Sequence, residues 1–216
     1  VETYTVVHNK GEPERGIVIA REKLSGRRFV SNTSDESVIL EAMLHHDFLG
    51  KSGFVKNSDG KNIISSRPAA GYILGDEGGG SDVGRKFLQD FIHEEMPAAI
   101  RQEAIDRFQL SQYGIQEQVY RKPFHNRYMA SFCRFITEHK SNPYCYGLFY
   151  DAFQNFFTKH VCKYSDFQTK PVHFVGSIAF YNADILRKAA TDRGMQVGMI
   201  LESPIAGLTL YHQELG

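Results

Sequence analysis

The chain has little of what marks nucleic-acid-binding, membrane or secreted proteins. Its 216 residues carry 25 Lys and Arg against 25 Asp and Glu, so the formal net charge is zero. Without a basic excess there is no electrostatic basis for binding nucleic acid or an anionic membrane. No run of about 18 apolar residues occurs, and the start, VETYTVVHNK, has no signal-peptide pattern. We therefore expect a cytoplasmic protein with neither nucleic acid nor membrane as a partner, which acts on a small neutral molecule.

Disulfide and metal motifs are also missing. The cysteines Cys133, Cys145 and Cys162 are odd in number and have no C-x-x-C spacing, which argues against a disulfide framework and a zinc knuckle. We expect buried, reduced thiols. The histidine pair at 45–46 and the H-V-C triplet at 160–162 lack the i, i+4 spacing that places two ligands on one helix face. The sequence therefore predicts no metal site in the protein itself.

Hydrophobic residues make up 42% of the chain and aromatic residues 12%, enough for a sizeable core in one domain or two small ones. Up to residue 62 the pattern is β-rich. The runs TYTVV, GIVIA and RRFVS predict a three-stranded meander, Thr33 with Glu36 predicts a capped helix, and GFVK predicts another strand that ends at the turn NSDGKN. Residues 1–62 therefore read as a small barrel or partial sheet.

From residue 63 to 216 the pattern changes to long helices between strands. GYIL reads as a short strand, and two apolar stripes at helical spacing predict buried helix faces: Phe87, Leu88, Phe91 and Ile92, then Phe149, Ala152, Phe153, Phe156 and Phe157. KPVHFVG and QVGMILE read as strands, while SIAFYNADILRKAA and SPIAGLTLYHQ read as helices. The polar stretch NSDGKNIISSR, residues 57–67, is where we expect the boundary between two folding units.

A glycine cluster follows GYIL in the stretch GDEGGGSDVG. Glycines between a strand and a helix can place backbone N–H groups around an anion or a sugar, although a tight turn alone would use the same residues. It is not a P-loop, because Arg85 and Lys86 stand where lysine and serine or threonine are required, and it has no G-x-G-x-x-G alignment.

Residues 63–216 resemble the C-terminal part of the BadF-type ATPases, and within them the N-acetylglucosamine-kinase-like proteins. The resemblance is carried by GYILGDEGGGSDVGRKFLQDF, VYRKPFHNRYMASFCRFITEH, PVHFVGSIAFYNADIL and GMILESPIAGLTLYH. It implies an α/β fold, α+β for the whole chain: a ribonuclease-H-like lobe of the sugar kinase, actin and Hsp70 superfamily with a helical insertion. In that family ATP and sugar lie between two lobes, and phosphoryl transfer uses Mg²⁺ and a carboxylate base.

The resemblance also implies two binding segments. Gly75, Asp76, Glu77 and Gly78 would face an amino sugar, with the two carboxylates as acceptors and the glycines allowing close backbone approach. The alternative for Asp76 is that it only caps the following turn. The family pattern resembles G-D-E-G-S-G, and Gly79 stands where that serine is expected, so a hydroxyl donor is lost.

The second segment, Gly176, Ser177 and Ala179, matches the turn on the adenosine side of the nucleotide. The first phosphate turn of the family, which resembles D-x-G-x-T-x-T, and its catalytic aspartate have no match in the chain. The second phosphate turn, which resembles G-T-G-S, is echoed only by residues 50–53. The sequence therefore identifies no catalytic residue.

Residues 1–61 resemble the small OB-like C-terminal domain of thiolase-like acyl-CoA enzymes, an accessory domain without the active-site cysteine. Three hypotheses follow. The chain could be a sugar-kinase lobe that completes its site with a missing N-terminal lobe or in a homo-oligomer; a non-catalytic binding or scaffold module formed by fusion; or a complete kinase with Asp76 or Glu77 as the base. The third is the least favoured, because the turns that would hold ATP in line are absent.

Overall fold

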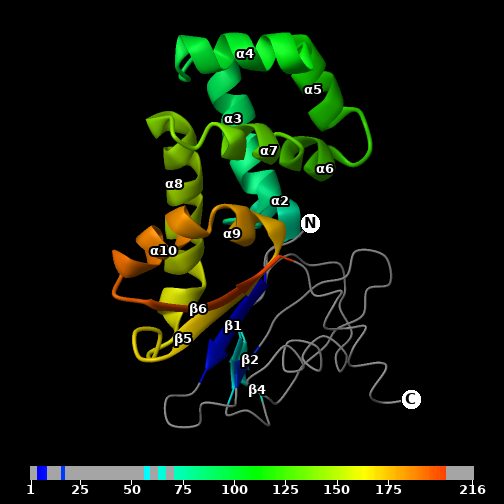
Figure 1. The fold of residues 1–216 in the computed structure, drawn as a ribbon. Helices are drawn as coiled ribbons and strands as arrows, with labels where there is room; N and C mark the ends of the chain where they lie inside the picture. Colours follow the sequence, from blue (N-terminus) through cyan, green and yellow to red (C-terminus); the bar gives the residue numbers. More distant parts are fainter. Residues whose placement is uncertain (1–3, 9–15, 18–55, 59–62, 67–70, 203–216) are drawn as a thin grey trace, which may run out of the picture.

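The computed structural model describes residues 4–8, 16–17, 56–58, 63–66 and 71–202. It shows a mixed α/β protein in which a helical layer stands over a small sheet (Figure 1). The strands are β1 (Tyr4–His8), β2 (Gly16–Ile17), β3 (Lys56–Ser58), β4 (Ile63–Ser66), β5 (Pro171–Val175) and β6 (Gln196–Leu201). The helices are α2 (Gly71–Leu74), α3 (Gly80–Ile92), α4 (Ala98–Phe108), α5 (Gln112–Tyr120), α6 (His125–Ala130), α7 (Cys133–Glu138), α8 (Pro143–Lys159), α9 (Ser177–Tyr181) and α10 (Ala183–Thr191), with a 3₁₀ turn, η1, at Val161–Lys163.

The main sheet has the order β2-β1-β5-β6. Strands β5 and β6 are parallel and are joined through α9 and α10, whereas β1 runs antiparallel to both β5 and β2. The predicted strands TYTVV, KPVHFVG and QVGMILE are confirmed in β1, β5 and β6. Strands β3 and β4 form a separate antiparallel pair. A strand from the first 62 residues therefore lies in the same sheet as β5, which belongs to the C-terminal part.

Strands β5 and β6 fit together around one histidine. The Nδ1 atom of His173 accepts a hydrogen bond from the backbone N–H of Met199 at 2.9 Å. A Cβ atom at Gly198 would lie 2.5 Å from the His173 ring, so only glycine leaves room for it. The register of the two strands shifts at this point, between Val172 and Phe174.

The core lies between α3, α7, α8, α10 and the sheet. Both predicted apolar stripes are confirmed, because their residues are buried apart from Ile92, which is partly exposed. Helix α8 begins after Asn142, whose side chain accepts the N–H of Tyr144, and Pro143 occupies its first turn. The phenylalanines of α3 and α7 contact one another directly, with the rings of Phe87 and Phe135 5.8 Å apart. Aromatic packing at helical spacing therefore holds this layer together.

Two sequence predictions are wrong. GYIL forms the short helix α2, not a strand. Ile73 and Leu74 are 74% and 80% exposed. No described strand pairs with this segment, so its backbone forms its hydrogen bonds within a local helix. SIAFYNADILRKAA is two helices, because Asn182 leaves the helical conformation with φ −117° and ψ 33°. Its buried side chain donates to the carbonyl of Ile178 and accepts from the hydroxyl of Thr137.

Several other predictions fall partly or wholly outside the described residues. GFVK overlaps β3 only at Lys56, and the pairing of β3 with β4 fits the predicted turn between them. The strand RRFVS, the helix capped by Thr33 and the final helix SPIAGLTLYHQ lie outside. Within the residues that the structure describes, no helix is long and apolar enough to cross a membrane.

Candidate functional site

The loop Gly75–Gly79 joins α2 to α3 and reverses the chain in a tight turn. The N–H of Gly79 donates to the carbonyl of Asp76 at 2.9 Å, and Asp76 and Gly78 have φ angles of +71° and +76°. A Cβ atom at Gly78 would lie 3.0 Å from Cβ of Phe156, and one at Gly79 would lie 2.9 Å from the carbonyl oxygen of Asp76. Glycine is therefore needed at both positions, at the first for its φ and at the second for space.

The two carboxylates of this loop point to different helices. Oδ2 of Asp76 accepts a hydrogen bond from the hydroxyl of Ser81, at the start of α3. Glu77 turns to the end of α8, where its Oε1 accepts from Nζ of Lys159 at 2.7 Å and its Oε2 from Nε2 of His160 at 3.1 Å. Burial acts to raise the pKa of Glu77, but the hydrogen bonds from Lys159 and His160, a backbone hydrogen bond and the charge of Lys159 together hold the pKa below its usual value. Asp76 and Glu77 thus have different partners.

A serine near position 79 bonds to the loop. Ser81, two residues further along, brings its hydroxyl to Asp76. Its side chain is buried, so the hydroxyl serves the loop itself. No sequence pattern signalled this role, because it depends on how α3 begins.

The second predicted segment lies where β5 meets α9. Gly176 has a φ of +138°, and its N–H donates to the carbonyl of Leu201 at 2.7 Å, which ties this turn to the end of β6. Ser177 begins α9, and Ala179 is completely buried. The start of α3, two residues after Gly78, lies against α9, because a Cβ atom at Gly80 would lie 3.4 Å from Cδ1 of Ile178.

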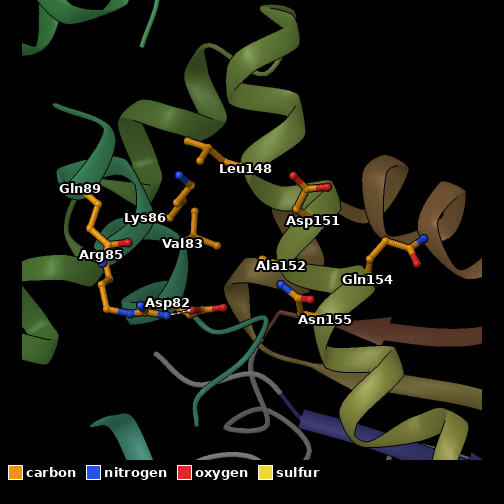
Figure 2. Close-up of a pocket in the computed structure, with 10 residues that line it drawn as sticks. All are labelled: Asp82, Val83, Arg85, Lys86, Gln89, Leu148, Asp151, Ala152, Gln154 and Asn155. Atoms are coloured by element: carbon orange, nitrogen blue, oxygen red, sulfur yellow. Dashed lines mark hydrogen bonds and ion pairs between the residues drawn. The ribbon is translucent and has the colours of Figure 1, made fainter. Parts of the chain in front are cut away.

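A groove of about 370 Å³ lies between α3 and α8, next to the loop Gly75–Gly79 (Figure 2). Its lining residues are Asp82, Val83, Arg85, Lys86, Gln89, Leu148, Asp151, Ala152, Gln154 and Asn155. Asp82 connects groove and loop, because its Oδ2 accepts from the N–H of Gly78 at 3.3 Å while its Oδ1 is paired with Arg85 at 2.5 Å. Burial raises the pKa of Asp82, and the contact with Arg85 only partly opposes this.

The groove offers both donors and acceptors of hydrogen bonds. Asn155 presents an amide and Asp151 a carboxylate, whereas Asp82 and Arg85 are paired with each other (Figure 2). Lys86 is less available, because it is paired with Asp90 and Glu95. Such a mixture without excess charge suits a neutral ligand with several hydroxyl groups. The sequence argument missed this groove, because its residues come from two helices about 70 residues apart.

Two of the three thiols are buried. All three cysteines are free, as predicted, with Cys133 and Cys145 buried and Cys162 partly so. Burial raises the pKa of Cys133 to about 12 and that of Cys145 to about 11, so neither is a thiolate at neutral pH. Within the described residues, no three His, Cys, Asp or Glu side chains lie together as metal ligands.

The fold is mixed α/β, and comparison with known proteins supports a kinase-like lobe. A solved structure from Porphyromonas gingivalis, described as a "Putative N-acetylglucosamine Kinase", is similar with 37% sequence identity and a TM-score of 0.68. The similarity covers 72% of this chain, and the chain spans 55% of that protein's length.

The first residues are similar to a different family. The family model of the thiolase-like protein type 1 additional C-terminal domain matches residues 1–61. No curated protein matches the chain. Both resemblances found in the sequence thus have support, one at each end of the chain.

Proposed function

We propose that the chain binds an amino sugar of the N-acetylglucosamine type, as one lobe of an ATP-dependent sugar kinase whose catalytic site it does not complete. The observation that carries the proposal is the similarity to the kinase from Porphyromonas gingivalis, at 37% identity over 72% of this chain. That protein is named for the sugar, and this chain spans 55% of its length. The remainder of such a fold would come from a missing N-terminal lobe or from a homo-oligomer.

The sugar would bind where the loop Gly75–Gly79 meets the groove. Among the described residues, Ser81 alone bonds to the carboxylate of Asp76, through Oδ2, so Oδ1 is left to accept from a sugar hydroxyl or amide. The backbone of Gly75 is partly exposed and could meet a ligand, whereas Gly78 is buried against Phe156 and would act by shaping the turn. Asp82 links this loop to the donors and acceptors of the groove. A sugar is the class of ligand that this mixture of groups recognises.

The nucleotide would bind at the second segment. Gly176 has no side chain to cover the end of β5, and Ser177 adds a hydroxyl at the start of α9. Ala179 is buried and would act through packing alone. In such a kinase ATP supplies the phosphoryl group and Mg²⁺ neutralises its charge. Within the described residues no three metal ligands lie together, so Mg²⁺ would be held chiefly by the phosphates of ATP. Because ATP-dependent kinases work where ATP is abundant, we propose a cytoplasmic location.

The second candidate function is a non-catalytic binding or scaffold module. It is favoured by the absence of the D-x-G-x-T-x-T turn from the sequence and by the match of residues 1–61 to an additional, accessory domain. We propose the same division for the chain: an OB-like segment up to residue 62, then a ribonuclease-H-like lobe of the BadF type from residue 63. The chain would then be a chimera of two families.

Ligand-induced stabilisation separates the two functions. A ligand present at 100 times its Kd should raise the free energy of unfolding by about 2.7 kcal/mol. We expect stabilisation by N-acetylglucosamine or by MgATP, and none by glucose or MgGTP at equal concentration. Asp76→Asn should lose the response to the sugar, whereas Asp106→Asn, the same change on α4, should keep it. No stabilisation by either ligand would refute the kinase-lobe proposal in favour of the scaffold.

A further inference from the structure

We infer that Lys159 and His160 are positioning residues for the loop Gly75–Gly79, and that Glu77 anchors this loop to them and makes no contact with the sugar. The inference rests on the proposed function, since it concerns the same loop. It assigns different tasks to the two adjacent carboxylates. Asp76 is the acceptor for a ligand, and Glu77 fixes where that acceptor lies.

The first argument is that both oxygens of Glu77 are already used. Lys159 and His160 follow each other at the C-terminal end of α8, and each donates to a different oxygen of the carboxylate. The side chains of Glu77 and His160 are only 12% and 14% exposed. A ligand could reach this carboxylate only by displacing a donor, and burial makes an unpaired donor or acceptor there costly.

The second argument is that the same helix end also holds the loop backbone. The Cα of Gly78 lies against Phe156, one turn before His160, and the rings of Phe156 and His160 are 5.3 Å apart. Charged and apolar contacts therefore fix the loop at neighbouring points. A loop held at two points keeps one conformation before a ligand arrives, which lowers the entropy cost of binding.

The third argument is that α8 also reaches the proposed nucleotide segment. The ring of Phe156 lies 6.4 Å from that of Phe174, which is on β5 two residues before Gly176. The end of α8 thus contacts the first binding segment and the strand that leads to the second. Since phosphoryl transfer depends on alignment of two ligands, the element that sets the distance between their sites is important for function.

The charges around Glu77 oppose its release. Lys159 and His160 face it from α8, and Asp82, itself paired with Arg85, is a like charge near it on α3. Outside its anchor the carboxylate would lose Lys159 and His160 and remain near Asp82. Repulsion of like charges then disfavours a conformation in which Glu77 turns to a ligand.

A double-mutant cycle on sugar binding by the full chain tests the inference. We expect His160→Ala and Glu77→Ala each to weaken the Kd for N-acetylglucosamine about tenfold, as misplacement of a binding group does. Because Glu77 acts through its anchor, the double variant should also lose about tenfold, and not the hundredfold of independent effects. His160→Gln, which keeps an N–H donor, should restore most of the affinity. Lys140→Ala, which breaks the remote pair with Asp184, should change nothing.

A loss of affinity in the double variant equal to the product of the two single losses would overturn the inference, since Glu77 would then contact the sugar independently. An unchanged Kd in His160→Ala would also overturn it. Amide hydrogen exchange gives a readout without sugar: His160→Ala should speed exchange in residues 75–79 and leave α4 unaffected. If the wild-type chain binds no N-acetylglucosamine, only the proposed function is refuted. The hydrogen-exchange measurement then still tests whether Lys159 and His160 hold the loop. Unchanged exchange in residues 75–79 would overturn the anchor itself.

Discussion

Replacing Gly84 by alanine should destabilise the protein, although alanine inside a helix is normally more stable than glycine. Gly84 lies in the middle of α3 where this helix crosses the end of α6. A Cβ atom there would lie 1.8 Å from the carbonyl oxygen of Met129 and 2.5 Å from its carbonyl carbon. Both are backbone atoms, so no side-chain rotation relieves the overlap. The helices must separate in an interior that is packed as densely as a crystal.

The magnitude follows from two opposing terms. Alanine in a helix interior gains up to about 1 kcal/mol over glycine. Overpacking a core costs about 1–3 kcal/mol and occasionally more, and a backbone clash belongs at the upper end of that range. We therefore expect Gly84→Ala to lower the free energy of unfolding by about 1–2 kcal/mol, because the overpacking term exceeds the helix term.

Gly147 provides the matched control. It lies inside α8, and a Cβ atom there would meet nothing within 4 Å. The same substitution should therefore stabilise the chain by about 0.5–1 kcal/mol. Urea unfolding followed by circular dichroism measures both variants, and in a chain of this size 1 kcal/mol corresponds to a shift of about 2–4 °C in Tm. If Gly84→Ala is neutral or stabilising like Gly147→Ala, the close crossing of α3 and α6 is refuted.

The remaining predictions concern the site and the division of the chain. Asp76→Ala should weaken amino-sugar binding by about 1–3 kcal/mol in calorimetry, because it leaves polar partners unpaired; unchanged affinity would make Asp76 a turn cap only. The purified chain should show no ATP-dependent phosphorylation of N-acetylglucosamine above background, and turnover that is abolished by Asp76→Asn would contradict this. The pKa of folded Glu77 lies below the ordinary 4.5. Between the folded and unfolded pKa values the unfolded chain binds more protons than the folded one, so the free energy of unfolding decreases as the pH is lowered. The difference in free energy of unfolding between wild type and Glu77→Gln should therefore become smaller below pH 4.5 in acid unfolding curves. Limited proteolysis should cut first within residues 57–67 and leave a fragment of about 150 residues; first cuts at residues 109–118 would oppose the two-unit division.

The helical layer could be predicted because its residues repeat with the period of a helix over several turns. Phe149 and Phe153 contact each other on α8 with ring centroids 6.3 Å apart, as their spacing implies. GYIL has no such repeat. Four apolar residues can form a strand or a helix, and the outcome depends on whether another strand lies beside them. The break at Asn182 was hidden for a related reason, since it depends on a hydrogen bond to Thr137, 45 residues earlier.

Only those features of the site that depend on residues adjacent in sequence could be predicted. The turn around Gly78 could be inferred, because a cluster of glycines indicates positive φ or close approach. The partners of Glu77 could not, because Lys159 and His160 are 82 and 83 residues away in sequence. Without them the sequence presents two adjacent carboxylates that look alike, and the structure separates them by what each contacts.

The main sheet contains strands from both parts of the chain, the part similar to the thiolase-like additional domain and the part that resembles the kinase. Strand β1, from the segment similar to the thiolase-like additional domain, pairs with the edge of β5 that β6 leaves open, and Tyr4 is the register partner of Val175. An unpaired edge at β5 would expose a row of backbone donors and acceptors. Since Val175 precedes Gly176, the N-terminal segment supports the end of the strand where the nucleotide would bind. A proteolytic cut between β1 and β5 divides the chain without dividing this sheet, so β1 can remain paired with β5 after cleavage.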